Sequence, residues 1–490
     1  MTSLALIRGL ARAGATQRAW ALFEAEGYEA RSRDSDALTL KGRLLKDRAR
    51  LASGPERVRL YGESESAYAQ AAALAPATYP LINAATVALL AGKGRRAQAL
   101  AGKTLALLDG GNVQGETPYW IAATRAEALL IMGKTAEARR ALAEAMKEAP
   151  EAWEDHASTL RQFESLLTEQ GEDAAWLDRH RPPASLHFSG ILGVAPDDAR
   201  AAAEVEEAVL AVKPGFGFGA LAAGADILIA EALIRQGGSL HVVLPCPVER
   251  FRAQSVVGVN EAWGPRFDAL IEAAERIDTP GDYDILSPAT IGLADEMAMG
   301  LALRQARMMD SRAVALRLRD RADGEGSEAA ADALWQRAGR LVSLPVTRAI
   351  AAPSLPDAPA LANMAFAAFD KAADVRLKAD WEGECSGYRL LGFADPAAAA
   401  DAAQAIAGMA QGGGRIGLDY VAADPADPSR APLERLLLVT AGGQGGIPVA
   451  TAPLALALAL HAPQFHCEPA GEIKANIGDI PYWNIWASRA

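Results

Sequence analysis

The sequence predicts a multidomain α and α/β protein with an all-helical first part, a parallel α/β second part and an α+β third part. Up to about residue 180, apolar residues recur three and four positions apart, which is the spacing of amphipathic helices. After the Arg-Pro-Pro sequence at 181–183, short β-rich runs alternate with helical stretches, as in βαβ units. The last part mixes both patterns between Gly and Pro breaks. The predicted domains are residues 1–181, 184–342 and 346–490.

The composition restricts the class of protein. Half of the 490 residues are hydrophobic and 22% are charged, which leaves enough apolar material for a large core. The 49 Lys and Arg residues against 61 Asp and Glu residues give a net charge of −12, which argues against nucleic acid as a partner. Three distant cysteines fit a reducing compartment, and no apolar run reaches the roughly 20 residues that span a bilayer. We therefore expect a cytoplasmic protein without a membrane segment.

The first part contains internal similarity between residues 79–108 and 119–150, each of which begins with an aromatic residue. A glycine marks the turn of each unit and an alanine is expected where its second helix packs: Gly92 and Ala97, then Gly133 and Ala136. These units resemble tetratricopeptide repeats, and the first also resembles the divergent repeats in the TRAF-binding region of stress-signalling kinases. The resemblance implies an α-solenoid of helix pairs that serves as a protein-binding platform. A non-repeating helical bundle is the alternative.

The second part shows the alternation of strands and helices that a parallel sheet requires. Strands are predicted at 185–191, 239–245 and 313–319, with a glycine-rich strand or turn at 216–221. Helices are predicted at 197–212, 225–235, 263–276 and 294–309. Residues 321–345 are expected to form a charged connector with a helix around Trp335. In the third part, we expect a strand at 434–440 and a helix at 396–409.

The strongest local signal is the glycine-rich segment before the helix predicted at 225–235. Glycines at a strand-to-helix turn let backbone N–H groups approach a phosphate, and a helix N-terminus favours negative charge. The carboxylate of Asp226 at that helix start is suited to a ribose hydroxyl or to capping. In the alternative interpretation, the glycines are close-packing points and Asp226 is only a cap.

The sequences HFSG, GALAAGAD and HVVLP follow one another at suitable spacing in the second part. Together they resemble the SLOG superfamily, which includes the lysine-decarboxylase-like LOG proteins. The resemblance implies a Rossmann-like domain that senses a nucleotide or nucleotide-derived ligand. Hydrolysis is not expected, because the acidic-plus-PGGxGT motif of the LOG enzymes is absent. By position, the ligand-binding residues, of which the last two would contact phosphate, are Ser189, Gly190, Gly217, Gly219, Gly224, Asp226, Glu231, Arg250 and Ser255.

In the third part, three segments resemble class III nucleotidyl cyclases: residues 388–407, 414–428 and 465–486. The resemblance implies a ferredoxin-like α+β domain. Such a cyclase needs two carboxylates to hold two metal ions. After an opening strand expected within 347–355, Ala351 or Ala352 stands where the first carboxylate belongs, and only Glu384 lies near the second position. The transition-state Asn–Arg pair is missing, and Lys474 alone remains of the base-recognition set.

These patterns predict no catalytic residue, no metal site and no firm cofactor, and the histidines lack metal-binding spacing. We expect a signalling or regulatory protein that combines a helical protein-binding platform, a nucleotide-ligand sensing domain and a catalytically dead cyclase-like module. A homodimer through residues 346–490 is a further expectation. Two alternatives are an enzyme of the nucleosidase or phosphoribohydrolase type, with Asp226 or Glu231 as its acid, and a residual adenylate or guanylate cyclase.

Overall fold

The structure is a computed structural model of the chain, and it divides into two compact units, Met1–Pro182 and Pro183–Ser488, which are described separately. It describes residues 3–487, except for 13, 112–114, 324–329, 352–359, 371–376, 410–413 and 477. The division falls within the Arg-Pro-Pro sequence. The second and third predicted domains lie together in the second unit. No helix among the described residues is long and apolar enough to cross a membrane.

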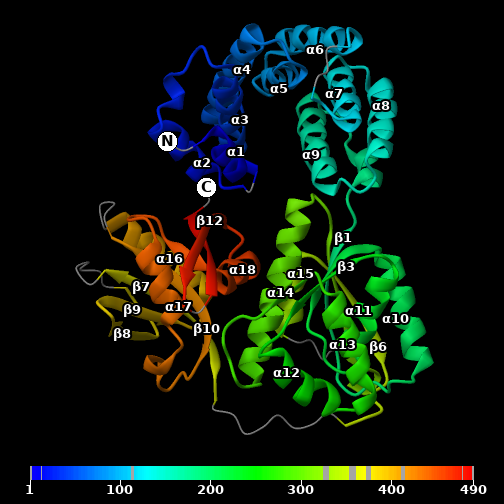
Figure 1. Cartoon of the computed structure of the whole chain (residues 1–490), viewed down its shortest axis with the longest axis vertical. Coiled ribbons are helices and arrows are strands. Elements are labelled where there is room, and N and C mark those ends of the chain that lie inside the picture. The colour runs from blue at the N-terminus through cyan, green and yellow to red at the C-terminus, as the bar shows by residue number, and fades with distance from the viewer. Residues whose placement is uncertain are drawn as a thin grey trace. The chain divides into compact units, whose positions relative to one another are not determined.

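The described residues of the first unit are helical, and helices that follow one another pack as hairpins (Figure 1). The helices are α1 (Leu4–Arg12), α2 (Thr16–Ala25), α3 (Ser35–Leu51), α4 (Gly54–Leu74), α5 (Thr78–Leu90), α6 (Gly94–Asp109), α7 (Pro118–Ile131), α8 (Thr135–Glu148) and α9 (Trp153–Gln170). The most extensive contacts within the unit join α3 to α4, α5 to α6 and α7 to α8. Each helix therefore buries its apolar stripe against its hairpin partner and the next pair.

The two predicted turn glycines end helices α5 and α7 in the left-handed conformation, with φ of 74° at Gly92 and 75° at Gly133. A residue with a Cβ is strained at such an angle, so glycine favours the stop. Five residues beyond these glycines, Ala97 and Ala138 are fully buried against the first helix of each pair. The predicted packing position Ala136 is wrong, because its side chain is exposed and Ala138 is the true equivalent of Ala97.

A chain of buried polar side chains links helices α3, α5, α7 and α9. Lys46 Nζ donates to Asn83 Oδ1 at 2.6 Å and to Gln162 Oε1 at 3.1 Å. Gln162 Nε2 in turn donates to Glu127 Oε1 at 2.5 Å, and Glu127 also accepts from Thr86. Burial lowers the pKa of Lys46 to about 7 and raises the pKa of Glu127. The chain satisfies polar groups that would otherwise be costly to bury between four helices.

The second unit begins with a six-stranded sheet in which every pair of neighbouring strands is parallel. Its strands are β1 (Ala184–Ser189), β2 (Pro214–Gly219), β3 (Ser239–Val243), β4 (Arg276–Asp278), β5 (Ala313–Asp320) and β6 (Arg340–Val346). Its helices are α10 (Ala199–Val212), α11 (Ala225–Arg235), α12 (Val248–Phe251), α13 (Gly264–Ala273), α14 (Pro288–Met308) and α15 (Ala330–Ala338). The strand order is β4-β3-β2-β1-β5-β6, so it reverses between β1 and β5.

Three elements of this domain differ from the sequence prediction. Strand β4 was not predicted and begins at the last residue of the helix expected at 263–276, because α13 already ends at Ala273. Helix α14 begins six residues before the expected residue 294, because Ser287 and Thr290 form a capping box at its start. The expected connector at 321–345 contains α15 around Trp335, as predicted, but it also contains most of β6. Strand β6 pairs with β5 and completes the sheet, so the predicted boundary at residue 342 falls inside a strand.

The remainder of the second unit forms a mixed seven-stranded sheet in the order β12-β13-β11-β10-β7-β9-β8. Its strands are β7 (Ala362–Asp370), β8 (Trp381–Cys385), β9 (Tyr388–Phe393), β10 (Ile416–Ala423), β11 (Val449–Thr451), β12 (Phe465–Ala475) and β13 (Gly478–Ala487). Its helices are α16 (Pro396–Met409), α17 (Glu434–Gly442) and α18 (Ala452–His461). Among the described strands of this seven-stranded sheet, only β10 and β11 pair in parallel.

The strand predicted at 434–440 is wrong, because these residues form helix α17. Leu436, Val439 and Thr440 are all fully buried, and their spacing of three and four residues is that of one helical face. The opening strand expected within 347–355 is wrong for its described residues 347–351, which follow β6 and form no strand. The first strand of this sheet is instead β7.

Helix α14 packs between the two sheets of the second unit (Figure 1). Its first half joins the core of the seven-stranded sheet through Ala289 and Leu293. Its second half contacts Phe218 and Val243 of the six-stranded sheet. Helix α18 approaches it closely at Gly300, where an added Cβ would lie 2.6 Å from Leu456 O. One helix thus contributes to both cores.

We predict that Gly300→Ala destabilises the second unit, although alanine is the better helix former. The new methyl group would overlap the backbone and Cβ of Leu456, and overpacking of this kind costs about 1–3 kcal/mol. Gly292→Ala is the matched control on the same helix, since its Cβ would meet only Asn363 Nδ2 at 3.5 Å. Urea unfolding of both variants measures the difference, and equal stability of the two would contradict the close packing of α14 and α18.

Candidate functional site

A buried polar cluster lies at the carboxyl ends of β1 and β5, where the strand order reverses. In open parallel sheets, this reversal creates the crevice in which ligands bind. Ser189 ends β1 in register with Arg317 of β5, and Arg317 Nη1 donates to Ser189 Oγ at 3.0 Å. Arg317 Nε also lies 2.6 Å from Asp332 Oδ1, and Arg319 Nη2 lies 2.7 Å from Asp332 Oδ2. Asp332 on α15 therefore pairs with both arginines.

Asp295 of helix α14 also belongs to this cluster, because it contacts side chains of both β1 and β5. The Nε2 atom of His187 lies 3.0 Å from Asp295 Oδ1, and Arg317 Nη2 lies 3.7 Å from Asp295 Oδ2. Burial alone would raise the pKa of Asp295, but the nearby His187 and Arg317 outweigh it and lower this pKa. Asp295 is thus held as a paired carboxylate between β1 and β5.

Asp226 is the exception in this region, because it has no cationic partner at ion-pair distance among the described residues. It lies in the first turn of α11, it is 6% exposed, and its Oδ2 accepts from the N–H of Ala222 at 3.1 Å. Its Oδ1 is buried without a hydrogen-bond partner. Burial raises the pKa of Asp226 to about 7, despite the lowering influence of the Ala222 and Gly190 amides. A half-satisfied buried carboxyl group of this kind is costly unless a ligand or proton compensates it.

The glycines predicted to line the crevice have packing roles in the structure. A Cβ on Gly217 would lie 2.3 Å from Leu233 Cδ2, and one on Gly219 would lie 2.4 Å from Phe188 O. A Cβ on Gly190 would lie 2.4 Å from Ala225 Cβ. Gly224 precedes α11 with φ of 111°, an angle that requires glycine. These contacts bring the end of β1 against the start of α11.

The remaining residues that the sequence predicted to bind ligand already interact with other groups of the protein. Glu231 accepts from Arg266 at 2.7 and 2.6 Å, and Arg250 Nε pairs with Asp284 Oδ1 at 2.6 Å. Ser255 is buried, and its carbonyl accepts from the N–H of Ala223 at 2.9 Å. Ser189, Gly190, Gly224 and Asp226 therefore meet at one place, whereas Gly217 and Glu231 face packing and ion-pair partners.

The sequence prediction missed the charged part of this cluster: His187, Asp295, Arg317, Arg319 and Asp332. His187 is buried, and its Nε2 atom pairs with the side chain of Asp295. One signal was present in the sequence, because strand β5 alternates two arginines with leucines near its end. Arginines at alternate positions of a strand lie on one face and imply acidic partners.

The seven-stranded sheet contains a separate buried ion pair. Asp419 on β10 is fully buried and accepts from Arg435 Nε at 2.9 Å and Nη2 at 2.8 Å. It also accepts from the N–H of Tyr420 and from Thr451 Oγ1. Arg435 Nη1 donates to Pro280 O at 2.6 Å, in the segment before α14. This bidentate pair joins β10, α17 and the approach to α14.

The acid positions expected from the cyclase resemblance do not converge. Ala351 lies outside any strand, and Ala352 lies outside the described residues. Strand β7 ends at Asp370, which is in register with Tyr388, whereas Glu384 is in register with Arg389. Because paired residues share a face and neighbouring residues alternate, Asp370 and Glu384 lie on opposite faces of the sheet. Lys474 is exposed and pairs with Asp479.

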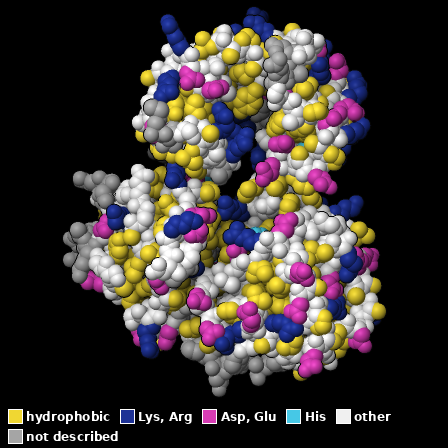
Figure 2. Space-filling model, viewed as in Figure 1, with side chains coloured by type: hydrophobic (Ala, Val, Ile, Leu, Met, Phe, Trp, Pro, Cys, Tyr) yellow, Lys and Arg dark blue, Asp and Glu magenta, His cyan; other side chains and the backbone are white. Residues whose placement is uncertain are grey.

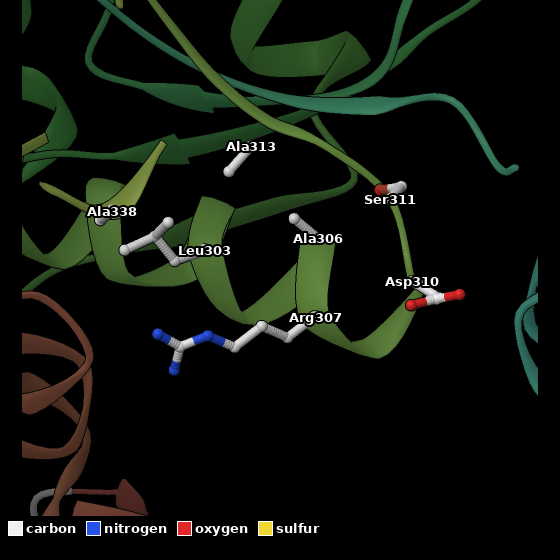
Figure 3. A pocket seen from close by; sticks show the side chains of 7 residues that line it. All are labelled: Leu303, Ala306, Arg307, Asp310, Ser311, Ala313 and Ala338. Atoms are coloured by element: carbon white, nitrogen blue, oxygen red, sulfur yellow. The ribbon is translucent and has the colours of Figure 1, made fainter. Parts of the chain in front are cut away.

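The described residues contain no group of three or more His, Cys, Asp or Glu side chains arranged to hold a metal ion. Two surface hollows lie away from the predicted site. The first, of about 320 Å³, is lined by Leu303, Ala306, Arg307, Asp310, Ser311, Ala313 and Ala338 (Figure 3). The second, of about 410 Å³, is lined by Pro469, Gly471, Glu472, Pro481, Tyr482 and Trp483. Neither set includes a residue that the sequence predicted to bind ligand.

Comparison with known proteins identifies the helical repeats. Residues 2–88 match the family described as Tetratricopeptide Repeats-Sensor. No curated protein matches the chain. A solved structure of a mutant Thermobaculum terrenum O-GlcNAc transferase matches with 14% sequence identity and a TM-score of 0.20, over 66% of this chain and 61% of that chain. The family match supports helix pairs of the tetratricopeptide type within residues 2–88 of the first unit.

We predict that Asp226→Asn removes a pH dependence of stability that the wild-type protein shows between pH 5 and pH 8. A carboxyl group whose pKa rises on folding stabilises the protein while protonated and loses that contribution as pH rises through about 7. At about 1.4 kcal/mol per pKa unit, and with roughly two pH units between pH 5 and the folded pKa, the variant should gain about 3 kcal/mol relative to the wild type over this interval. Urea unfolding at constant ionic strength measures this difference.

Asp268→Asn is the control for this experiment. The ion pair with Arg252 lowers the pKa of Asp268, so Asp268 is already ionised at pH 5. The stability of Asp268→Asn should therefore change with pH in the same way as that of the wild type. Stability profiles of the wild type and Asp226→Asn that remain parallel from pH 5 to pH 8 would contradict the buried, uncompensated state of Asp226.

We predict that Asp419→Asn destabilises the second unit by about 3 kcal/mol, because it leaves the guanidinium of Arg435 without its charge partner. Asp401→Asn, at an exposed position on α16, should change stability by less than about 0.5 kcal/mol. Thermal unfolding of the two variants tests the pair. A loss no larger than that of the control would show that the Asp419–Arg435 pair does not hold this sheet.

Proposed function

We propose that the protein is a ligand-responsive signalling protein of the cytoplasm, in which a nucleotide or nucleotide-derived ligand binds the second unit and the helical repeats bind a protein partner. The observation that carries the proposal is Asp226, whose buried Oδ1 has no partner at the strand-order reversal. Ligands of doubly wound, Rossmann-like sheets bind at this position. The SLOG resemblance of the same residues supports a nucleotide-type ligand.

The helical repeats support the second half of this proposal. Tetratricopeptide-type helix pairs form platforms for protein partners, and the matching family is described as a sensor. The first unit carries a buried polar chain but no cluster that suggests chemistry among its described residues. A partner-binding role is therefore the simplest function for this unit.

The seven-stranded sheet would act as a regulatory module with the ancestry of a cyclase but without its reaction. Positions 351 and 352, where the first acid belongs, are both alanine, and Glu384 lies on the face of the sheet opposite Asp370 at the end of β7. The buried Asp419 is engaged by Arg435 and Thr451. Dimerisation through residues 346–490 stays a prediction of the sequence.

Helix α14 offers a route between the ligand site and this module. Asp295 pairs with His187 in the polar cluster, and the next residue, Glu296, lies 2.9 Å from His461 Nε2 on α18. Adjacent helical residues point about 100° apart, so one helix turn contacts both sites. A ligand that moved Asp295 would therefore also displace Glu296 relative to α18.

A second candidate function is hydrolysis of a nucleotide-type ligand at the same site. A buried acid with a pKa of about 7 is suited to general acid–base catalysis at neutral pH, and Asp226 has this property. The two candidates differ in one measurable respect, because a sensor returns its ligand unchanged and a hydrolase does not.

Two measurements on the full chain test the proposal. Thermal unfolding is followed with a panel of nucleosides, nucleotides, cyclic nucleotides and NAD-type compounds, and chromatography shows whether each compound is recovered intact. We expect at least one compound to raise the unfolding temperature and to be recovered intact, and we expect Asp226→Ala to lose this effect. Asp268→Ala is the control and should retain it. Release of free base would show that the site hydrolyses its ligand and would contradict the sensing role. Formation of a cyclic nucleotide in the presence of Mn²⁺ would contradict the proposal that the seven-stranded sheet is not catalytic.

A further inference from the structure

A surface hollow of about 320 Å³ lies at the amino end of strand β5, the opposite end of this strand from Arg317 and Arg319. It is lined by the end of α14, the turn after this helix, the first residue of β5 and the last residue of α15 (Figure 3). Ligand pockets span roughly 300–1,000 Å³, so this volume suits a small metabolite better than a nucleotide. The hollow shares no residue with the ligand site proposed at the start of α11.

The floor of the hollow is aliphatic. It consists of Leu303 and Ala306, which are buried, and of Ala313 and Ala338, which are half-buried. Leu303, Ala313 and Ala338 also take part in the apolar cluster around Trp335, so the floor belongs to a close-packed core. Three of the four side chains are single methyl groups, and a short hydrocarbon chain can make dispersion contacts with all of them.

One end of the hollow favours a positive charge. Helices α14 and α15 both end beside it, and the carboxyl end of a helix carries a partial negative charge. Asp310, which follows α14, adds a carboxylate to the lining. The Oγ atom of Ser311 is buried and has no hydrogen-bond partner among the described residues, so it can accept from an ammonium group.

Arg307 places a positive charge on another side of the hollow. Figure 3 shows its side chain extending away from Asp310 and Ser311. Its Nη2 atom donates to Ala459 O at 3.4 Å, which is a long hydrogen bond. A guanidinium group has five N–H donors and can hold a carboxylate with two of them, so Arg307 can bind an anion while it keeps this contact.

The lining therefore carries two opposite charges on either side of an aliphatic floor. A ligand with one charge would be attracted by one of these groups and repelled by the other. The described lining has no aromatic side chain on which a nucleotide base could stack. Recognition must come from this local arrangement, because basic and acidic side chains are interspersed over the visible surface (Figure 2).

We propose that this hollow binds a small zwitterion whose ammonium and carboxylate groups are separated by a short aliphatic chain. The ammonium group would pair with Asp310 and donate to Ser311 Oγ, the carboxylate would pair with Arg307, and the chain would lie on the aliphatic floor. An ω-amino acid and a short peptide both have this chemistry. The hollow would be a second ligand site, independent of the one at the strand-order reversal.

Isothermal titration of the full chain with isomeric amino acids tests this proposal. The compounds 5-aminopentanoate and 2-aminopentanoate have the same atoms and differ in the separation of their charges, and 4-aminobutyrate and 2-aminobutyrate form a second such pair. Pentylamine and pentanoate carry one charge each, and dialanine represents a peptide.

We expect a compound with separated charges to bind at least tenfold more tightly than either α-isomer and either singly charged compound. Tighter binding of dialanine than of both ω-amino acids would assign the site to a peptide rather than to a free amino acid. An α-isomer or a singly charged compound that binds as tightly overturns the proposal, and so does a panel in which nothing binds. Either result leaves the site at the start of α11 untouched.

Asp310→Asn and Arg307→Gln test the two charged ends of the hollow separately. Asparagine tolerates the left-handed backbone of residue 310, where φ is 50°, and Arg307 is exposed, so both variants should fold. Each should bind the zwitterion at least fivefold more weakly than the wild type. Arg312→Gln, at an exposed position outside the lining, is the control and should leave the affinity unchanged. Wild-type affinity in either Asp310→Asn or Arg307→Gln would contradict the proposed pairing.

Discussion

The second unit depends on the burial of helix α14 between two sheets of different topology. A helix that is covered on opposite sides needs small and apolar residues on both faces, and α14 provides Leu293 for one core and Met297 and Ala298 for the other. Gly300 lets α18 approach to backbone distance. Because interiors are close-packed, a shift of α14 at one core cannot occur without a change at the other. The two sheets are therefore structurally coupled through this helix.

The charged residues of α14 extend this coupling to the polar groups. Asp295 belongs to the cluster at the end of β1, whereas Glu296 contacts His461. In this cluster, Arg317 and Arg319 lie at ion-pair distance from Asp332, whereas Asp226 has no cationic partner at that distance among the described residues and its buried Oδ1 accepts no hydrogen bond. An unsatisfied buried group in an otherwise paired region costs stability, so its presence calls for a ligand or a proton. The unpaired, buried Oδ1 of Asp226 is the physical basis for the proposed sensing role.

Periodicity and breakers predicted much of the secondary structure but not the tertiary partners of individual residues. The apolar spacing located α11 and β5 to within a residue, and Gly92 and Gly133 marked two helix ends. The stretch 434–440 was misassigned because a short apolar run fits both a strand and a helix. The packing role of the glycines and the ion-pair partners of the arginines depend on contacts between different elements, which periodicity does not reveal. Examples are Arg319 of β5 with Asp332 of α15, and Glu231 of α11 with Arg266 of α13.

Hydrogen–deuterium exchange of the full chain tests the central claim most directly, because it locates the ligand without a mutation. It is measured with and without the compound that raises the unfolding temperature most. The account predicts slower exchange in residues 190–193 and 222–228, which meet at the start of α11, together with a smaller change in α18 through α14. Protection confined to the first unit, or to the hollow lined by Trp483 and its neighbours, would contradict a ligand site at the reversal of strand order.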